Sequence, residues 1–244
     1  MLDVFTQASY VSNPVFEQPY NALVIGASGA IGGAFMRALE MDPYCKHVAC
    51  VSRVHTPGFD LTDAASIQAA AAGHAAAGPY QVIIDATGAL TIHGVGPEKS
   101  LASVQSLALL DNFHVNAVGP LLVLRHFAPL LAPGASVYAK LSARVGSISD
   151  NKKGGWYGYR AAKAALNMLL QTAAIELQRK NPQLRVVALQ PGTVRSDLSK
   201  AFANSVSHLL EPEESVAGML TTLKGLPPKQ GAHYVDYQGQ AIEW

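Results

Sequence analysis

The chain has 244 residues, of which 49% are hydrophobic and 14% are charged. Its formal net charge of +1 provides no basic surplus for nucleic acid or for an anionic membrane surface. Its two cysteines, Cys45 and Cys50, lack the neighbouring Cys or His residues of a zinc site, so we expect neither a metal site nor a disulfide framework. A chain so poor in charge is expected to bury much of its surface, part of it against other subunits.

The N-terminal residues 1–20 have neither the basic start nor the apolar core of a signal peptide. No uncharged apolar run has the length and composition of a membrane span. We therefore expect a cytoplasmic protein with a short irregular N-terminal arm, residues 1–20, and one domain, residues 21–244.

Strand-like and helix-like stretches alternate along the rest of the chain. The predicted strands are 21–29, 47–53, 80–88, 135–143 and 184–192, followed by a closing stretch at 231–239. The predicted helices are 30–42, 62–78, 103–131 with a kink at Gly119 and Pro120, one that begins near Tyr157, and 212–226. This alternation predicts a single α/β domain with a doubly wound, mostly parallel sheet and helices on both faces.

A glycine loop joins the first strand to the first helix. Its glycines, Gly26, Gly29 and Gly32, are three residues apart. At this position glycines let the backbone approach a pyrophosphate, which the N–H groups of the helix start can bind. The alternative is that small residues allow close packing of helix on sheet. The nucleotide site predicted here comprises Gly26, Ser28, Gly29, Ala30, Ile31 and Gly32.

The end of the second strand indicates which nucleotide is bound. It reads Val51-Ser52-Arg53, without the acidic residue that binds the ribose hydroxyls of NAD. Because Arg53 can pair with a 2′-phosphate, we predict NADP(H) rather than NAD(H). The alternative is a solvated surface arginine. Asp60 and Leu61 are assigned to an adenine-pocket turn, although helix capping accounts for this segment nearly as well.

A tyrosine and a lysine are the candidate acid/base pair. Tyr159 and Lys163 are four residues apart, so on a helix they share one face. An ammonium group beside a phenol favours the phenolate and lowers the tyrosine pKa. The alternative is a structural tyrosine at a helix start. Tyr157 has Ala161 four residues on and is predicted to serve packing.

These landmarks together resemble the short-chain dehydrogenase/reductase family over residues 21–244, and most of all its C-factor and Sniffer-like carbonyl reductase branch. The resemblance rests on the glycine loop and on the following motifs: "DATG" (85–88), "VNAVGP" (115–120), "GSISDN" (146–151), "YRAAK" (159–163), "PGTVRSDL" (191–198) and "VDYQGQAIEW" (235–244).

The resemblance implies a Rossmann-like fold and an oxidoreductase that works with NAD(P)(H). It implies that Tyr159 is the acid/base, that Lys163 holds the nicotinamide ribose, and that Asn116 supports a proton relay through water. The residues that would further surround the cofactor are Ala86, Thr87, Gly88, Pro191, Gly192, Val194 and Ser196.

The chain departs from the family at three places. Ala30 stands where the middle glycine of the loop is usual, and Asp85 and Ala86 replace two asparagines. The family's second serine, which polarises the substrate carbonyl, is replaced by Ala143. We therefore assign the catalytic serine to Ser142, which should face away unless the strand bulges, and keep Ser147 as a second candidate.

We expect an NADP(H)-dependent oxidoreductase that acts on a small carbonyl or alcohol. The alternative is a cofactor-binding sensor of the same fold with little turnover, and Ala143 is the argument for it. The stretches 115–124 and 164–175 contain no charged residue, so each helix should be covered on both sides. We therefore predict a homodimer or homotetramer.

Overall fold

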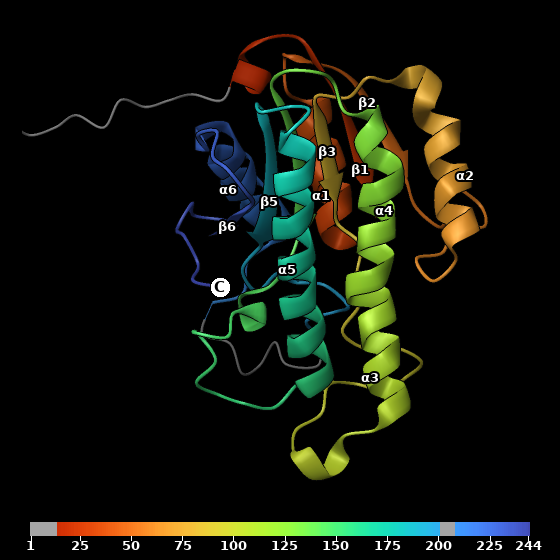
Figure 1. Cartoon of the computed structure of the whole chain (residues 1–244), viewed down its shortest axis with the longest axis vertical. Helices are drawn as coiled ribbons and strands as arrows, with labels where there is room; N and C mark the ends of the chain where they lie inside the picture. Colours follow the sequence, from red (N-terminus) through yellow and green to blue (C-terminus); the bar gives the residue numbers. More distant parts are fainter. Residues whose placement is uncertain (1–13, 201–207) are drawn as a thin grey trace, which may run out of the picture.

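The protein is described by a computed structural model that covers residues 14–200 and 208–244. Within these residues six parallel strands form one sheet in the order β2-β1-β3-β4-β5-β6 (Figure 1). The strands are β1 (Tyr20–Ile25), β2 (Cys45–Val51), β3 (Val82–Asp85), β4 (Ser136–Leu141), β5 (Leu184–Gln190) and β6 (His233–Asp236). The predicted fold class is confirmed, and the described sheet is parallel throughout.

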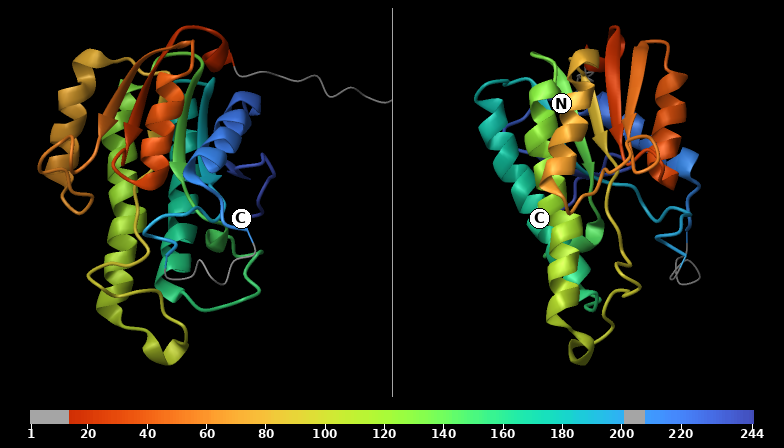
Figure 2. Two further views of the ribbon diagram at one scale, coloured as in Figure 1. Left: turned by 180° about the vertical axis from the view of Figure 1, so that it is seen from behind. Right: turned by 90° about the vertical axis from the view of Figure 1, so that its right-hand side faces the viewer.

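Helices cover both faces of the sheet (Figure 2). They are α1 (Ala30–Glu40), α2 (Ala64–His74), α3 (Ser106–Phe113), α4 (Gly119–Phe127), α5 (Tyr157–Gln178) and α6 (Pro212–Gly225). One apolar core lies between the sheet and α1 and α6, and a second lies between the sheet and α2, α4 and α5. The central strands β3 and β4 are buried along their whole length, as expected for strands covered on both faces.

The chain passes from β2 to α2 without another strand. Doubly wound dinucleotide-binding sheets usually have the order 3-2-1-4-5-6, in which a further strand flanks β2. Here residues 52–63 form turns, and α2 begins at Ala64 after its N-cap residue Asp63, whose side chain accepts the N–H of Ala65 at 2.9 Å. Strand β2 is therefore an edge of the described sheet.

The predicted long helix is one helical segment with a local change of winding. Between α3 and α4, residues His114–Val118 form a π-helical turn, directly before the predicted kink at Gly119. A Cβ on Gly119 would lie 2.5 Å from the carbonyl oxygen of Leu61, which explains the glycine. With 25 residues and a mean hydropathy of 1.4, Ser106–Leu130 could span a membrane by length and composition. In this fold it packs against α2 and α5.

The predicted N-terminal arm needs correction near its end. Val15 and Phe16, within the 3₁₀ turn Pro14–Glu17, are buried against the sheet and α6. Strand β1 begins at Tyr20, whose ring meets that of Phe16 edge-on at 5.4 Å. The packed part of the chain therefore includes residues assigned to the arm. Residues 1–13 lie outside the described residues.

Candidate active site

The predicted site residues gather where the strands end at their carboxyl edge. The strand order reverses between β1 and β3, which are neighbours in the sheet but are separated in the chain by β2 and α2. In open parallel sheets this switch point is where ligands bind. The glycine loop follows β1, and the segment 86–88 follows β3, so both lie at the switch point.

The glycine loop is packed so tightly that two of its glycines are required. Gly26 has a φ of +87°, and a Cβ there would lie 3.0 Å from the backbone of Ala86. A Cβ on Gly32 would lie 2.2 Å from the carbonyl oxygen of Gly26. Close packing of helix on sheet, the alternative weighed for this loop, therefore explains these two glycines, and it also brings the N-terminus of α1 to the loop.

The N-terminus of α1 fits a phosphate group. Gly29 precedes the helix in an extended conformation and provides no side-chain cap. The N–H groups of the first turn, which includes Ala30, Ile31 and Gly32, are therefore available to an anion. Ser28 lies exposed in the turn before them. These residues could hold the pyrophosphate of a dinucleotide, as the sequence predicts.

The surroundings of Arg53 are mixed in charge. Arg53 is exposed just beyond β2, and Asp60 is near enough for Arg53 to contribute to a lowered Asp60 pKa. The main cause of that lower pKa is hydrogen bonding from Thr62, whose N–H and hydroxyl both donate to Asp60 at 2.8 Å. Asp60 thus organises the turn before α2. Leu61, the other predicted adenine-pocket residue, packs its carbonyl against Gly119.

Three predicted residues converge after β3. Asn116 is fully buried in the π-helical turn, accepts the N–H of Ala89 at 3.1 Å and donates to its carbonyl at 2.8 Å. Gly88, with a φ of +133°, lies directly beside it, since a Cβ there would be 3.0 Å from Asn116 Oδ1 and 3.7 Å from Lys163 Nζ. The structure therefore brings Gly88, Asn116 and Lys163 together.

Tyr159 and Lys163 occupy the same buried face of α5, as their spacing predicts. Tyr159 is 7% exposed and Lys163 is 3% exposed. The lysine Nζ lies 5.6 Å from the centroid of the tyrosine ring and donates to the carbonyl of Leu141 at 3.2 Å. Trp156 packs edge-on against Tyr159 at 6.2 Å. Tyr157, predicted to serve packing, is 38% exposed.

The predicted lowering of the Tyr159 pKa is wrong for the protein without cofactor. Burial raises the pKa of Tyr159, because an apolar environment disfavours the phenolate. Burial also lowers the pKa of Lys163 to about 7, and the nearby charge of Lys140 adds to this effect. An ammonium group over the ring face, with its own charged form disfavoured, does little to stabilise a phenolate.

Ser142 does not face Tyr159. Its hydroxyl donates at 2.6 Å to Oδ1 of Asn167, which is eight residues after Tyr159 on α5. Eight residues correspond to about 12 Å along a helix at ~1.5 Å per residue. The Ser147 hydroxyl accepts the N–H of Asp150 at 3.0 Å. The Ser142 hydroxyl is therefore engaged in local structure, whereas the Ser147 hydroxyl accepts a hydrogen bond without using its own proton. Ala143 stands where the family's second serine is usual.

The segment after β5 forms the other wall of the site. The carbonyl of Pro191 accepts the hydroxyl of Ser215 on α6 at 2.6 Å, and Gly192 has a φ of +78° against Leu210 and Tyr237. Val194 is buried, and its carbonyl accepts the hydroxyls of both Ser196 and Ser199.

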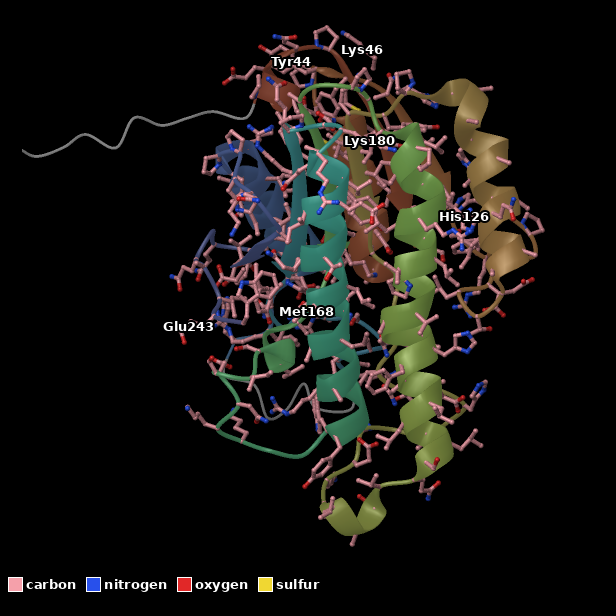
Figure 3. The ribbon with its side chains drawn as sticks, in the orientation of Figure 1. Tyr44, Lys46, His126, Met168, Lys180 and Glu243 are labelled. Atoms are coloured by element: carbon pink, nitrogen blue, oxygen red, sulfur yellow. The ribbon has the colours of Figure 1, made fainter. Side chains whose placement is uncertain are left out.

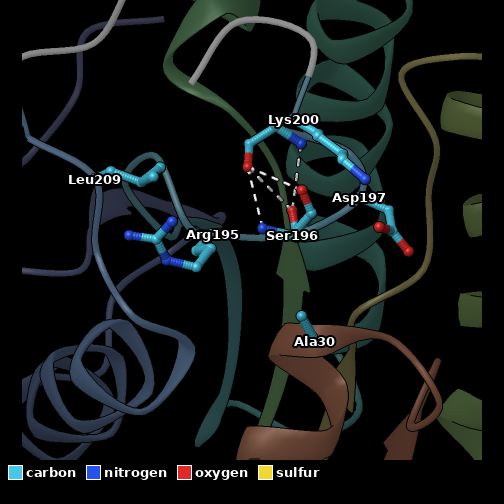
Figure 4. A pocket seen from close by; sticks show the side chains of 7 residues that line it. Ala30, Arg195, Ser196, Asp197, Lys200 and Leu209 are labelled. Carbon is cyan, nitrogen blue, oxygen red and sulfur yellow. Dashed lines mark hydrogen bonds between the residues drawn. The ribbon is translucent and has the colours of Figure 1, made fainter. Parts of the chain in front are cut away.

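An open pocket of about 440 Å³ joins this wall to the glycine loop (Figure 4). Ala30 at the start of α1 faces Ser196 across it. Residues predicted to bind the pyrophosphate and residues predicted to surround the nicotinamide thus border the same pocket. Its lining residues are Ala30, Arg195, Ser196, Asp197, Ser199, Lys200 and Leu209.

Sequence reasoning missed two buried charges near the site. Lys140 on β4 pairs with Asp85 at the end of β3, with Nζ 3.0 Å from Oδ1. Glu98, 6% exposed, accepts the N–H of Gly158 at 3.1 Å and so caps the start of α5. The lysine within an otherwise apolar strand was a signal in the sequence for the Lys140–Asp85 pair. The role of Glu98 has no local signal, because it depends on a contact between residues that are 60 positions apart in the chain.

The comparisons with known proteins agree with this arrangement. The model of the short-chain dehydrogenase family matches residues 20–206. The chain is 31% identical over 232 residues to 1-hydroxy-2-glutathionyl-2-methyl-3-butene dehydrogenase of Rhodococcus sp., which covers 91% of this chain and 98% of the relative. It is 34% identical over 168 residues to C-signal of Myxococcus xanthus, which covers 68% of this chain and 94% of that protein.

Solved structures share the fold at low sequence identity. Carbonyl reductase Sniffer of D. melanogaster has a TM-score of 0.79 at 22% identity and covers 93% of this chain and 100% of its own. An NADPH-bound carbonyl reductase from chicken fatty liver has a TM-score of 0.78 at 23% identity, covering 93% of this chain and 95% of its own. From its family model, its relatives and its fold, the chain belongs to the short-chain dehydrogenase family and is an NAD(P)-dependent oxidoreductase of a small-molecule substrate.

Proposed function

We propose that the chain is an NADP(H)-dependent reductase of a small carbonyl compound, with Tyr159 as the proton donor. The observation that carries this proposal is the convergence of Tyr159, Lys163, Gly88 and Asn116 at the switch point of the sheet. A fold that only bound a nucleotide would not need a buried tyrosine and a buried lysine on one helix face beside it.

The chemistry follows from these side chains. When bound, the nicotinamide supplies hydride to the carbonyl carbon, and Tyr159 donates its proton to the carbonyl oxygen to complete the alcohol. At neutral pH Tyr159 holds its proton, as a tyrosine with the ordinary pKa of ~10 already does, so the proton is available for reduction. After Tyr159 has donated its proton, the phenolate must be protonated again. Lys163 and the π-helical turn that carries Asn116 lie nearby and could supply that proton. The name of the Rhodococcus relative describes oxidation of an alcohol, the reverse reaction.

The preference for NADP(H) rests on Arg53. Arg53 is exposed at the carboxyl end of β2, where a 2′-phosphate would lie, and β2 ends without an acidic residue. The nearby carboxylate of Asp60 opposes this preference but is already hydrogen-bonded to Thr62.

A cytoplasmic location stays a prediction.

The test combines binding with turnover. Purified protein should bind NADPH more tightly than NADH, and Arg53→Ala should reduce that difference, as measured by cofactor fluorescence. NADPH consumption over a panel of aldehydes and ketones should be lost in Tyr159→Phe, while NADPH binding remains. Turnover that is unchanged in Tyr159→Phe would refute the role of this residue, and tighter NADH binding would refute the cofactor preference.

A second function of a different class has its own support. Ala143 offers no hydroxyl, and the Ser142 hydroxyl donates to Asn167, so a cofactor-binding sensor with little turnover is the alternative. It predicts that tight NADPH binding is accompanied by no turnover on any carbonyl of the panel.

A further inference from the structure

Two opposite charges are buried together in the middle of the sheet. Asp85 on β3 and Lys140 on β4 are partners in register, and both side chains are 0% exposed. Burying an ion costs several kcal/mol before pairing, so such a pair is weak evidence for stability. The purpose of the pair must be sought in what it contacts.

Both charges converge on Thr87. Lys140 Nζ donates to the Thr87 carbonyl at 2.6 Å and to its hydroxyl oxygen at 3.0 Å. Asp85 Oδ1 accepts the N–H of Thr87 at 2.9 Å and its hydroxyl proton at 2.5 Å. The remaining oxygen of Asp85 accepts the hydroxyl of Tyr138 at 3.3 Å. Every polar group of Thr87 is thus held by the pair.

Thr87 precedes the glycine that borders the site. Gly88 has a φ of +133° and leaves no room for a side chain between itself and Asn116. A shift in the backbone of Thr87 would therefore move Gly88 relative to Asn116 and Lys163. The pair acts on the site through this one peptide segment.

The pair also acts on Lys163 by charge. After burial, the charge of Lys140 is the next largest cause of the lowered Lys163 pKa, and Asp85 opposes it more weakly. Tyr138 on β4 is a titratable side chain that hydrogen-bonds to the pair, and Tyr159 on α5 lies beside Lys163. The register partners on the flanking strands, Ile25 on β1 and Ala188 on β5, are apolar. Little else can compensate a change in the pair.

We propose that Asp85 and Lys140 form a positioning pair, which holds Thr87 and Gly88 in the conformation that the cofactor site requires. The proposal replaces a neutral bracing role, implied by the family's two asparagines, with a charged one. It rests on the proposed function for the reaction that the pair serves, whereas its charge interaction can be measured in the protein alone.

The experiment compares wild type with the double variant D85N/K140M, which removes both charges and the donors to Thr87. The pair of Lys224, which is half exposed, and Asp42, which is largely buried, is also 3.0 Å apart and provides the matched control D42N/K224M. The first measurement is the pH titration of Lys163 in cofactor-free protein, followed by lysine ¹³Cε NMR and assigned with Lys163→Met. The second is the Kd for NADPH, measured by fluorescence.

In D85N/K140M, Lys163 should titrate at a higher pH than in wild type. Both charges are gone, and the charge of Lys140, which lowers the Lys163 pKa, had the larger effect. The Kd for NADPH should rise about tenfold, as expected from the loss of one to two hydrogen bonds that position the loop. The control pair should change neither. An unchanged Lys163 titration would overturn the charge interaction, and an unchanged Kd would overturn the positioning role.

Two measurements keep the proposal testable if the double variant does not fold. Thr87→Val removes one hydroxyl and should weaken NADPH binding several-fold; an unchanged Kd would again overturn the positioning role. Wild-type Lys163 that titrates near the ordinary lysine value would overturn the charge interaction. If wild type binds no NADPH, the proposed function fails, and the titration of Lys163 still decides the charge interaction.

Discussion

At the scale of single residues, the side chain at position 143 decides between the two candidate functions. Ala143 follows β4, and its carbonyl accepts the hydroxyl of Tyr234 at 2.7 Å, which holds the backbone in place. Loss of one donor to a developing oxyanion typically costs 10²–10³-fold in rate. A hydroxyl restored at this position is therefore expected to act on rate and not on cofactor affinity.

Ala143→Ser should raise kcat for carbonyl reduction by roughly tenfold or more, with the Kd for NADPH unchanged. Steady-state kinetics at saturating NADPH measures the first quantity, and fluorescence titration measures the second. Ser147→Ala is the companion variant, since the Ser147 hydroxyl accepts the N–H of Asp150 without using its own proton. An unchanged kcat would exclude Ser147 as a substitute donor, and a lower kcat would identify it as one. No gain in Ala143→Ser would favour the sensor.

Lys163 should make the stability of the cofactor-free protein depend on pH. Its folded pKa of about 7 lies below the unfolded value of ~10.4, so between these values the unfolded chain binds more protons. The free energy of unfolding should therefore rise with pH from about 7 upward, by at most ~1.4 kcal/mol per pH unit. Below pH 7 both states are protonated, and the slope from this group vanishes.

Urea unfolding at pH 7, 8 and 9 tests this expectation by comparing wild type with Lys163→Met. The difference between the two proteins should shrink as the pH rises, because neutral Lys163 carries little burial cost. A difference that stays constant over this range would show that Lys163 titrates outside it.

Much at this scale could be predicted, since Tyr159, Lys163 and Asn116 lie in local motifs whose spacing sets their direction on a helix. The fate of Ser142 could not, because it depends on Asn167, 25 residues away in the chain. The reversed pKa shift of Tyr159 also escaped prediction, because burial is a property of the folded protein.

At the scale of elements, the start of α5 depends on a residue from another segment. Trp156, just before the helix, has a φ of +55° and provides no side-chain cap. Glu98 takes over this role, since its carbonyl accepts the N–H of Trp156 at 2.5 Å and its carboxylate accepts that of Gly158. The helix turn that carries Tyr159 is thus fixed by the loop before α3.

Glu98→Ala should lower the free energy of unfolding by about 1 kcal/mol, the usual cost of a lost helix cap. Its other carboxylate oxygen is buried without a partner, which keeps the loss from being larger. Glu98→Gln retains an acceptor and should lose less. Chemical denaturation measures both, and an Ala variant as stable as wild type would contradict the capping role.

The order and type of the elements could be predicted from hydrophobic periodicity and from the glycines and prolines between them. The π-helical turn at His114–Val118 was predicted only as a kink, because π and α winding share the same local residues. The sequence of β6 itself does not show that it pairs parallel to β5, because the crossover through α6 sets the direction of this strand.

At the scale of the whole molecule, an apolar surface runs along the outer sides of the segment from α3 to α4 and of α5. These helices lie side by side in front of the sheet (Figure 1), and Met168 points outward from α5 (Figure 3). Met168 is 66% exposed and Leu110 is 64% exposed. The large exposed apolar residues of this surface are Leu107, Leu110, Val118, Met168 and Ile175. Such a surface is typical of a subunit contact.

We predict that the protein forms a homodimer or homotetramer through this surface. Met168→Glu should shift the species in sedimentation velocity toward monomer at micromolar concentration, since a charge buried in an apolar contact is costly. Met41→Glu is the matched control, because Met41 is 84% exposed at the end of α1 on the opposite face. A wild-type monomer would contradict the prediction.

Strand β2, left at the edge of the described sheet, also affects how the protein should be handled. Its outer backbone groups are a template on which another molecule could add a strand. Lys46 on this edge is exposed, and Arg53 follows the strand, so two such edges repel each other. Because salt screens repulsion between surface charges, stocks concentrated for crystallisation should stay dispersed longest in buffers of low ionic strength.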